Sequence, residues 1–169
     1  SFTNYELLGQ TSDWIGFDNY KELFTNDLQF WHAVRVTLVY ALVAVPLKLA
    51  TALAVAMLLN RERRGTGLFR SLFYLPSLLG GSVAVAIIWQ AMFDRNGAFN
   101  SLLAVFGVEG KPWVNDPDWA LETIILLGMW QFGAPMVIFL AGLKQVPQEL
   151  YEAAAVDGAG PWRKFRNIT

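Results

Sequence analysis

Residues 71–93 read SLFYLPSLLGGSVAVAIIWQAMF and contain no charged side chain. An apolar run of this length exceeds the roughly 18 residues that mark a candidate membrane-spanning helix. Two further segments share this character: residues 36–59, VTLVYALVAVPLKLATALAVAMLL, and residues 123–143, TIILLGMWQFGAPMVIFLAGL. All three are apolar nearly all round, whereas a surface helix of a soluble protein is apolar on one side. The sequence therefore predicts an all-α membrane protein with three transmembrane helices.

The composition of the whole chain supports this prediction. Of its 169 residues, 54% are hydrophobic and 16% are charged, whereas about 25% charge is usual in globular proteins. Three buried helices in a soluble domain of this size would leave too few polar residues to cover them. The net charge of −1 gives no indication of nucleic-acid binding. The absence of cysteine excludes disulfides and thiol nucleophiles, and the single His32 excludes zinc motifs built on a histidine pair.

Motifs for nucleotide or catalytic chemistry are missing from the sequence. It contains no GxxxxGK[ST] phosphate loop, no HExxH and no GxSxG. We therefore expect a chain that is not an enzyme on its own and that holds no cofactor. A membrane enzyme and a secondary transporter are the alternative functions. The lack of a catalytic constellation argues against the first, and the lack of carboxylates inside the apolar segments argues against the second.

Helix-breaking residues occur in each apolar segment. They are Pro46 in the first, Pro76, Gly80 and Gly81 in the second, and Gly133 and Pro135 in the third. Lipid offers the backbone no hydrogen-bond partner, so the segments are still expected to be helical. Such residues are tolerated inside a membrane where a neighbouring helix or a water-filled cavity satisfies the freed backbone groups.

Charge in the loops predicts how the chain is oriented. The loop 60–70 holds Arg61, Arg63, Arg64 and Arg70 against a single Glu62, whereas acidic residues outnumber basic ones in 1–35 and 94–119. The positive-inside rule then gives the following order: external 1–35, span 36–59, cytoplasmic 60–70, span 71–93, external 94–119, span 120–143 and cytoplasmic 144–169. Because residues 1–35 must cross the membrane before the first span, we expect an earlier helix and a longer chain.

Short helices are predicted outside the spans. Phe17, Tyr20, Leu23 and Phe24 recur at helical spacing and predict an interfacial helix. Residues 98–106 form a short apolar helix in the external loop. Asp116 and Pro117 suit an N-cap and a first helical position, so the helix that contains the third span is expected to begin there.

Polar and amphipathic side chains within the spans are candidates for a translocation path. The dipeptide Trp-Gln occurs twice, as Trp89–Gln90 and as Trp130–Gln131. A Trp face can pack on a sugar ring and Gln can bond hydroxyls, although packing between helices explains each residue as well. Lys48 lies near the middle of the first span, where a charge costs roughly 2.5–3.5 kcal/mol. It is expected either to face a cavity or partner, or to bond a carbonyl freed by Pro46.

The C-terminal stretch, YEAAAVDGAGPWRKFRNIT, carries the most specific motif. Pro147 and Gly158 suit the start and stop of a helix over 148–157. Glu152, Ala153, Ala154, Gly158 and Ile168 have the spacing EAA, three residues, G, nine residues, I, which resembles the EAA loop of bacterial ABC importer permeases. The segments GFDNY, VPLKLATALAVAMLLNRERRG, FRSLFYLP, DPDWAL and LAGLKQVPQELYEAAAVDGAG extend the resemblance to the carbohydrate-uptake branch, of the maltose and glycerol-3-phosphate type.

The resemblance implies a function and partners. In that family the EAA loop is a coupling helix that contacts a cytoplasmic ATPase, which binds the ATP. Glu152, Ala153, Ala154 and Gly158 are the implied contact residues. A second permease subunit, an extracytoplasmic solute-binding protein and membrane lipid are the implied partners, with no nucleic acid. The implied place is the inner or plasma membrane of a bacterial cell, as a multi-pass sugar-transport subunit with further spans before Ser1 and after Thr169.

Overall fold

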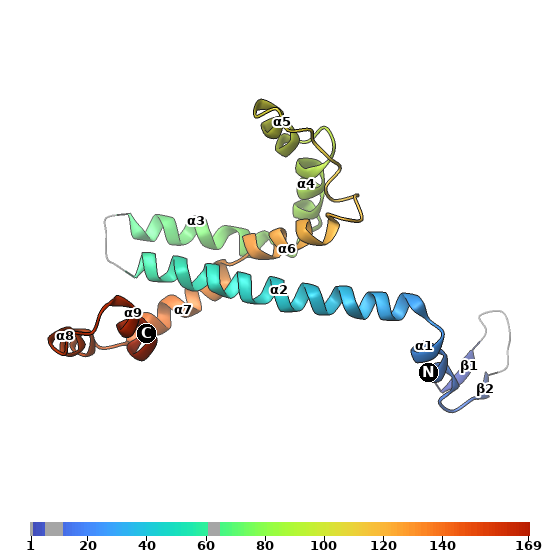
Figure 1. Ribbon diagram of the computed structural model, residues 1–169, viewed down its shortest axis with the longest axis horizontal. Helices are drawn as coiled ribbons and strands as arrows, with labels where there is room; N and C mark the ends of the chain where they lie inside the picture. Colours follow the sequence, from blue (N-terminus) through green and yellow to red (C-terminus); the bar gives the residue numbers. More distant parts are fainter. Residues whose placement is uncertain (1, 6–11, 61–64) are drawn as a thin grey trace. The chain divides into compact units, whose positions relative to one another are not determined.

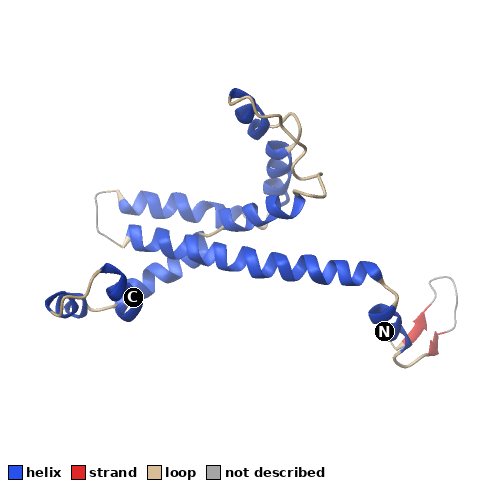
Figure 2. Ribbon diagram, in the orientation of Figure 1, coloured by secondary structure: helices blue, strands red, loops and turns tan. Residues whose placement is uncertain are grey.

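The computed structural model describes residues 2–5, 12–60 and 65–169. The chain divides into two compact units, Ser1–Leu42 and Val43–Thr169. Figure 1 gives the element labels, and Figure 2 shows that the regular secondary structure of the described residues is helical apart from one short hairpin. Residues 61–64 of the predicted cytoplasmic loop 60–70 lie outside the described residues, and they include Arg61, Arg63 and Arg64.

The first unit contains the hairpin, one short helix and the start of a long one. Strands β1 (Thr3–Tyr5) and β2 (Ser12–Trp14) pair antiparallel, which the sequence did not lead us to expect. Helix α1 (Asp18–Thr25) confirms the predicted helix. Phe2 stacks on Trp14 with 5.6 Å between ring centroids and meets Phe17 edge-on at 5.4 Å. Aromatic contacts therefore tie the hairpin to the turn before α1.

Helix α2 (Leu28–Leu59) begins at a capped turn and is continuous through Pro46. Asp27 Oδ1 accepts from the backbone N–H of Gln29 at 2.8 Å and of Phe30 at 3.1 Å, which satisfies amides of the first turn. The helix has 32 residues, or about 48 Å at 1.5 Å per residue. It contains the first predicted span and starts eight residues before that span.

The second and third apolar segments are each divided into two helices. Helix α3 (Thr66–Leu79) is followed by α4 (Val83–Phe93), and α6 (Ala120–Trp130) by α7 (Gly133–Gln145). The bends are 99° and 41°. Among the described residues, α2 alone is long and apolar enough to cross a membrane as one helix, and up to three spans result if each bent pair counts as one. The predicted spans are therefore present as apolar segments, but two of them are not single helices.

The position of each break follows from local chemistry. Gly80 and Gly81 end α3, and Ser82 starts α4 because its Oγ accepts from the Val85 N–H at 3.3 Å. Pro76 lies inside α3 without ending it. Pro135 lies in the first turn of α7, where a missing N–H costs little.

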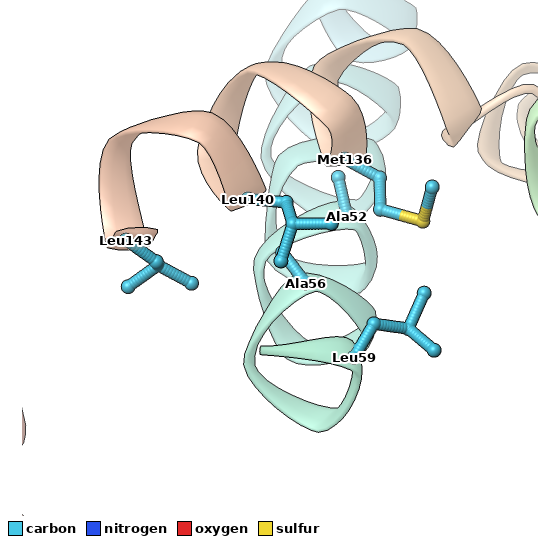
Figure 3. Packing of buried hydrophobic residues seen from close by; sticks show 6 residues of the cluster. All are labelled: Ala52, Ala56, Leu59, Met136, Leu140 and Leu143. Atoms are coloured by element: carbon cyan, nitrogen blue, oxygen red, sulfur yellow. The ribbon is translucent and has the colours of Figure 1, made fainter. Parts of the chain in front are cut away.

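Apolar packing in the second unit joins α2 to α7. The buried cluster consists of Ala52, Ala56 and Leu59 from α2 with Met136, Leu140 and Leu143 from α7. Figure 3 shows Met136 and Leu140 lying against the two alanines. Alanine at the contact lets the two backbones approach closely, as small residues do between membrane helices.

The loop between α4 and α6 is ordered around one buried amide. Helix α5 (Ala98–Val105) carries Asn100, which is 6% exposed. Its Nδ2 donates to the carbonyls of Asp94 at 3.0 Å, Arg95 at 3.1 Å and Lys111 at 2.7 Å. Its Oδ1 accepts from Trp113 Nε1 at 2.6 Å. One side chain therefore holds both ends of the loop to the helix within it.

The helix start predicted at Pro117 is wrong by three residues. Asp116 does not cap a helix at Pro117; its Oδ1 accepts from the N–H of Asp118 at 3.0 Å within a turn. Helix α6 begins at Ala120, after that turn has closed through the Ala120 N–H and the Asp116 carbonyl at 2.8 Å.

Candidate functional site

Helix α8 (Gln148–Val156) covers the residues for which a helix was predicted in the EAA loop, and α9 (Pro161–Ile168) follows it. Pro147 occupies the N-cap of α8. The two helices are held together partly by Tyr151, whose hydroxyl lies 3.0 Å from Thr169 Oγ1. The structure thus places the EAA residues on a short helix close behind α7.

A Schellman motif ends α8 and explains the spacing of the EAA sequence. Gly158 has φ +72°, a left-handed conformation that favours glycine. The Gly158 N–H donates to the Ala155 carbonyl at 3.1 Å, and the Ala159 N–H donates to the Ala154 carbonyl at 2.8 Å. These two bonds define the motif, and they place Gly158 four residues after Ala154, whose carbonyl accepts the longer-range bond. The last Ala of EAA and the conformation of Gly158 therefore belong to one hydrogen-bonded turn.

The EAA residues do not share one face of α8. Glu152 and Ala153 are exposed, whereas Ala154 is half-buried. Glu152 Oε1 accepts from Gln148 Nε2 at 3.0 Å, so this carboxylate has a partner within its own helix. Ala153 is flanked at helical spacing by Leu150 and Val156, which are 51% and 90% exposed. Sequence reasoning missed this exposed apolar strip of Leu150, Ala153 and Val156, although its three-residue spacing is visible in the sequence.

A surface hollow lies beside the start of α8. Its volume is about 520 Å³, and it is lined by Asn60, Leu143, Lys144, Gln145, Gln148 and Tyr151, among others. These residues come from the end of α2, the end of α7 and the first turns of α8. The hollow therefore adjoins the coupling helix with mostly polar side chains.

The two helix breaks meet at a second candidate site. Ser77 Oγ donates to the Gln131 carbonyl at 3.0 Å and accepts from the Ala134 N–H at 3.0 Å. Gln131 Nε2 donates to the Gly80 carbonyl at 3.3 Å. Each break thus satisfies backbone groups of the other, as expected for breaks inside a membrane. Sequence reasoning missed Ser77; the available signal was a hydroxyl three residues before a glycine pair within a charge-free segment.

The five candidates for a translocation path are only partly brought together. Trp89 and Trp130 lie side by side, with ring centroids 6.2 Å apart. Gln131 adjoins Trp130 and is engaged with Gly80 as described, whereas Gln90 is exposed. Lys48 is half-buried on the face of α2 that also carries Ala52, and it makes no hydrogen bond or ion pair to a described residue. The bond from Lys48 to a carbonyl freed by Pro46 is therefore not seen.

Metal binding receives no support from the described residues. In the ranges 2–5, 12–60 and 65–169, acidic and histidine side chains form no group of three that could hold a metal ion.

The helices and the EAA loop can now be compared with known proteins. The profile of the family described as the binding-protein-dependent transport system inner membrane component matches residues 48–169. The match covers α3 to α9 and the last twelve residues of α2. The chain belongs to this family.

Curated relatives of this permease chain are named as transporter subunits. It is 50% identical over 170 residues to the probable ABC transporter permease protein YesP of Bacillus subtilis (strain 168), covering 100% of the chain and 55% of that protein. It is 36% identical over 148 residues to the lactose transport system permease protein LacF of Rhizobium radiobacter, covering 85% and 49%. It is 32% identical over 157 residues to the trehalose/maltose transport system permease protein MalF of Thermococcus litoralis, covering 92% and 52%. The permease chain spans about half the length of these relatives.

Solved structures share the fold. A chain of a bacterial ABC transporter involved in the import of the acidic polysaccharide alginate superposes with a TM-score of 0.78 at 24% identity, covering 92% of the permease chain and 55% of that chain. A chain of the alginate transporter in complex with an alginate pentasaccharide-bound periplasmic protein gives a TM-score of 0.76 at 24% identity, covering 91% and 54%. The all-α arrangement of bent helices is therefore that of ABC transporter permeases.

Proposed function

We propose that this chain is part of a transmembrane subunit of an ATP-driven, binding-protein-dependent sugar importer in a bacterial inner or plasma membrane. Its partners are a cytoplasmic ATPase that binds the ATP, a second permease subunit and an extracytoplasmic solute-binding protein, with lipid around the spans. The chain contributes part of the translocation path and no catalytic group. The external side carries residues 1–35 and 94–119, and the cytoplasmic side carries α8.

The observation that carries this proposal is the surface of α8. A short helix fixed by a Schellman turn presents an apolar strip, Leu150, Ala153 and Val156, with nothing described in this chain covering it. Exposed apolar residues that are grouped together mark a binding surface. The small side chain at the centre of the strip allows close approach by the groove of an ATPase, and α7 directly precedes the helix.

A sugar as substrate is supported by the names of relatives. Several similar permeases are named for lactose, galactooligosaccharides, trehalose and maltose, or multiple sugars. Within the chain, Lys48, Trp89, Gln90, Trp130 and Gln131 are the proposed path residues. The paired rings of Trp89 and Trp130 offer flat apolar faces on which a sugar ring can pack.

The test uses the full-length chain, coexpressed with its neighbouring permease, ATPase and binding protein and reconstituted in lipid vesicles. We expect uptake of labelled sugar that requires both ATP and the binding protein. Uptake driven by an ion gradient without ATP would instead identify a secondary transporter.

A charge placed on the strip tests the role of α8. Ala153→Asp introduces a carboxylate at the proposed ATPase contact, so the ATPase should dissociate from the membrane complex or lose its coupling to uptake. Ala155→Asp is the matched control, because Ala155 is also exposed and lies on the opposite side of the same helix. Equal ATPase retention in both variants would remove α8 as the contact.

A further inference from the structure

The junction of the two helix breaks is a reciprocal set of caps. A helix end leaves carbonyls and N–H groups without partners in its own helix. Here Gly80 is the C-cap of α3, Gln131 is the C-cap of α6, and Ala134 lies in the first turn of α7. The Gly80 carbonyl accepts a hydrogen bond from the Gln131 side chain. The single hydroxyl of Ser77 bonds both the Gln131 carbonyl and the Ala134 N–H.

The caps are supplied across the chain and not by the helices themselves. Ser77 and Gln131 are 54 residues apart in sequence. The N-cap of α7 is Phe132, which makes no side-chain capping bond. Removing either polar side chain therefore leaves backbone groups of the neighbouring break without a partner.

Glycine makes the close approach possible on both sides. A Cβ at Gly133 would overlap the Phe73 carbonyl and lie 2.7 Å from Tyr74 Cα, both backbone atoms of α3. A Cβ at Gly80 would meet only the end of the Gln131 side chain. The start of α7 thus lies directly against the backbone of α3, and the Gln131 amide fills the space above Gly80.

Both breaks lie at similar depth. Gly80 comes 14 residues after Thr66 at the start of α3, or about 21 Å along the helix axis. Gly133 comes 12 residues before Gln145 at the end of α7, or about 18 Å. If Thr66 and Gln145 both lie at the predicted cytoplasmic surface, the junction lies within a hydrocarbon core of roughly 30 Å. Water is not available there to cap the breaks.

The junction connects the coupling helix to the candidate path. Helix α7 leads through Val146 and Pro147 into α8, and its other end is held at Ser77. From the junction, α4 leads to Trp89 and α6 ends at Trp130, whose rings lie 6.2 Å apart. A displacement of α7 therefore reaches Trp130 along the chain itself, and it reaches Trp89 through the three hydrogen bonds that join the two breaks.

We propose that Ser77 and Gln131 are positioning residues that clasp the two helix breaks together, so that movement of α8 is transmitted to the Trp89–Trp130 pair. This inference rests on the proposed function, in which α8 meets the ATPase and the tryptophans line the path. It also gives Gln131 a new role. The Gln131 amide holds the Gly80 carbonyl and positions the path, while contact with the sugar belongs to the rings.

The experiment measures coupling in the reconstituted full-length complex with its second permease, ATPase and binding protein. Ser77→Ala removes the shared hydroxyl, and Gln131→Met removes the amide at similar length. Each should lower the sugar transported per ATP hydrolysed about five-fold or more. KM for the sugar-loaded binding protein should stay unchanged in Ser77→Ala, because the Ser77 hydroxyl bonds only backbone groups of the α6–α7 break. The double variant should fall no further than the single ones, because either change opens the same clasp.

Two further variants separate the clasp from general damage. Gly80→Ala should lower coupling in the same way, because its Cβ displaces the Gln131 amide while every polar group is kept. Ser71→Ala is the matched control in the same helix. The Ser71 hydroxyl bonds only the Gly67 carbonyl of α3, at 3.3 Å, so coupling should be that of the wild type.

The outcomes distinguish the two proposals. A KM increase confined to Gln131→Met, with coupling kept, would make Gln131 a sugar contact and overturn the clasp. Normal coupling in Ser77→Ala, Gln131→Met and Gly80→Ala, in a complex that transports, would overturn it as well. A wild-type complex without ATP-dependent sugar uptake would overturn the proposed function instead. In that case faster hydrogen exchange at the Ala134 amide in Ser77→Ala still supports the clasp as a structure, and unchanged exchange contradicts it.

Discussion

Helix α2 and the bent pair α6–α7 both contain a proline, yet only the pair is interrupted. Helix α2 continues through Pro46, and its C-terminal end packs against α7 by apolar contacts. The α6–α7 chain breaks before Pro135, at Gln131 and Phe132, where Ser77 supplies partners for the freed backbone groups. The comparison teaches that proline alone does not break a helix in this chain. A break forms where a neighbouring segment offers polar caps and glycine offers space.

The largest loss of stability is expected for a substitution at the contact between the unbroken helix α2 and α7. Met136 is 0% exposed between α2 and α7. Met136→Ala should destabilise the purified permease complex by about 2–5 kcal/mol, because the cavity cannot be filled by the alanines opposite. The thermal unfolding midpoint in detergent measures this. Ile138→Ala is the control, because Ile138 is 70% exposed and should change little. Equal shifts would mean that the α2–α7 contact contributes no more stability than an exposed position of α7.

The next largest loss of stability is expected for a substitution in the broken pair α6–α7. Gly133→Ala should destabilise the complex by about 1–3 kcal/mol, because the new Cβ meets backbone atoms of α3 that cannot rotate away. The matched control is Gly142→Ala in the same helix, where a Cβ meets nothing within 4 Å. Since alanine has the higher helix propensity, this control should be neutral or stabilising by up to about 1 kcal/mol. The opposite order in unfolding midpoints would contradict the close approach of α7 to α3.

A third effect tests the turn after α8. Gly158→Val places a β-branched residue at φ +72°, which should strain the turn by about 1–2 kcal/mol. The Schellman bonds to Ala154 and Ala155 should loosen, and less ATPase should copurify with the permease. Gly160→Ala is the control, because Gly160 has φ −69° and open space around its Cα. ATPase retention that is equal in both variants would show that the turn does not shape the contact.

The smallest effect is expected for a hydroxyl inside the unbroken helix. Thr51 Oγ1 donates to the Leu47 carbonyl at 2.7 Å, within α2 itself. Thr51→Val should therefore change the stability of the complex by about 0.5 kcal/mol or less, because the carbonyl keeps its bond in the helix. A loss as large as that of Gly133→Ala would mean that a hydroxyl inside the unbroken helix contributes as much stability as the close backbone approach at the break, which the comparison denies.

The parts of the fold that could be predicted from the sequence depend on local patterns. The apolar segments, the helices at residues 18–25, 98–105 and 148–156, and the stop at Gly158 depend on composition, spacing and turn chemistry within a few residues. The hairpin before α1 was missed because its pairing depends on aromatic contacts such as Phe2 with Trp14. The start of α6 was placed too early because the Asp-Pro signal at residue 116 belongs to the preceding turn.

The sequence by itself determined that this chain has long apolar helical segments, short helices between them and an EAA loop of permease type, because each depends on neighbouring residues. Only the tertiary structure decided where two of the segments break and what holds the breaks. Ser77 and Gln131 are 54 residues apart, and their pairing depends on the close backbone approach that Gly133 allows. Tertiary structure also separated Ala153 from Ala154, because the docking of α9 on α8 covers one side of the helix and leaves the other exposed. A polar group in an apolar surrounding must find a partner wherever the fold provides one, and the identity of that partner is a property of the packed chain.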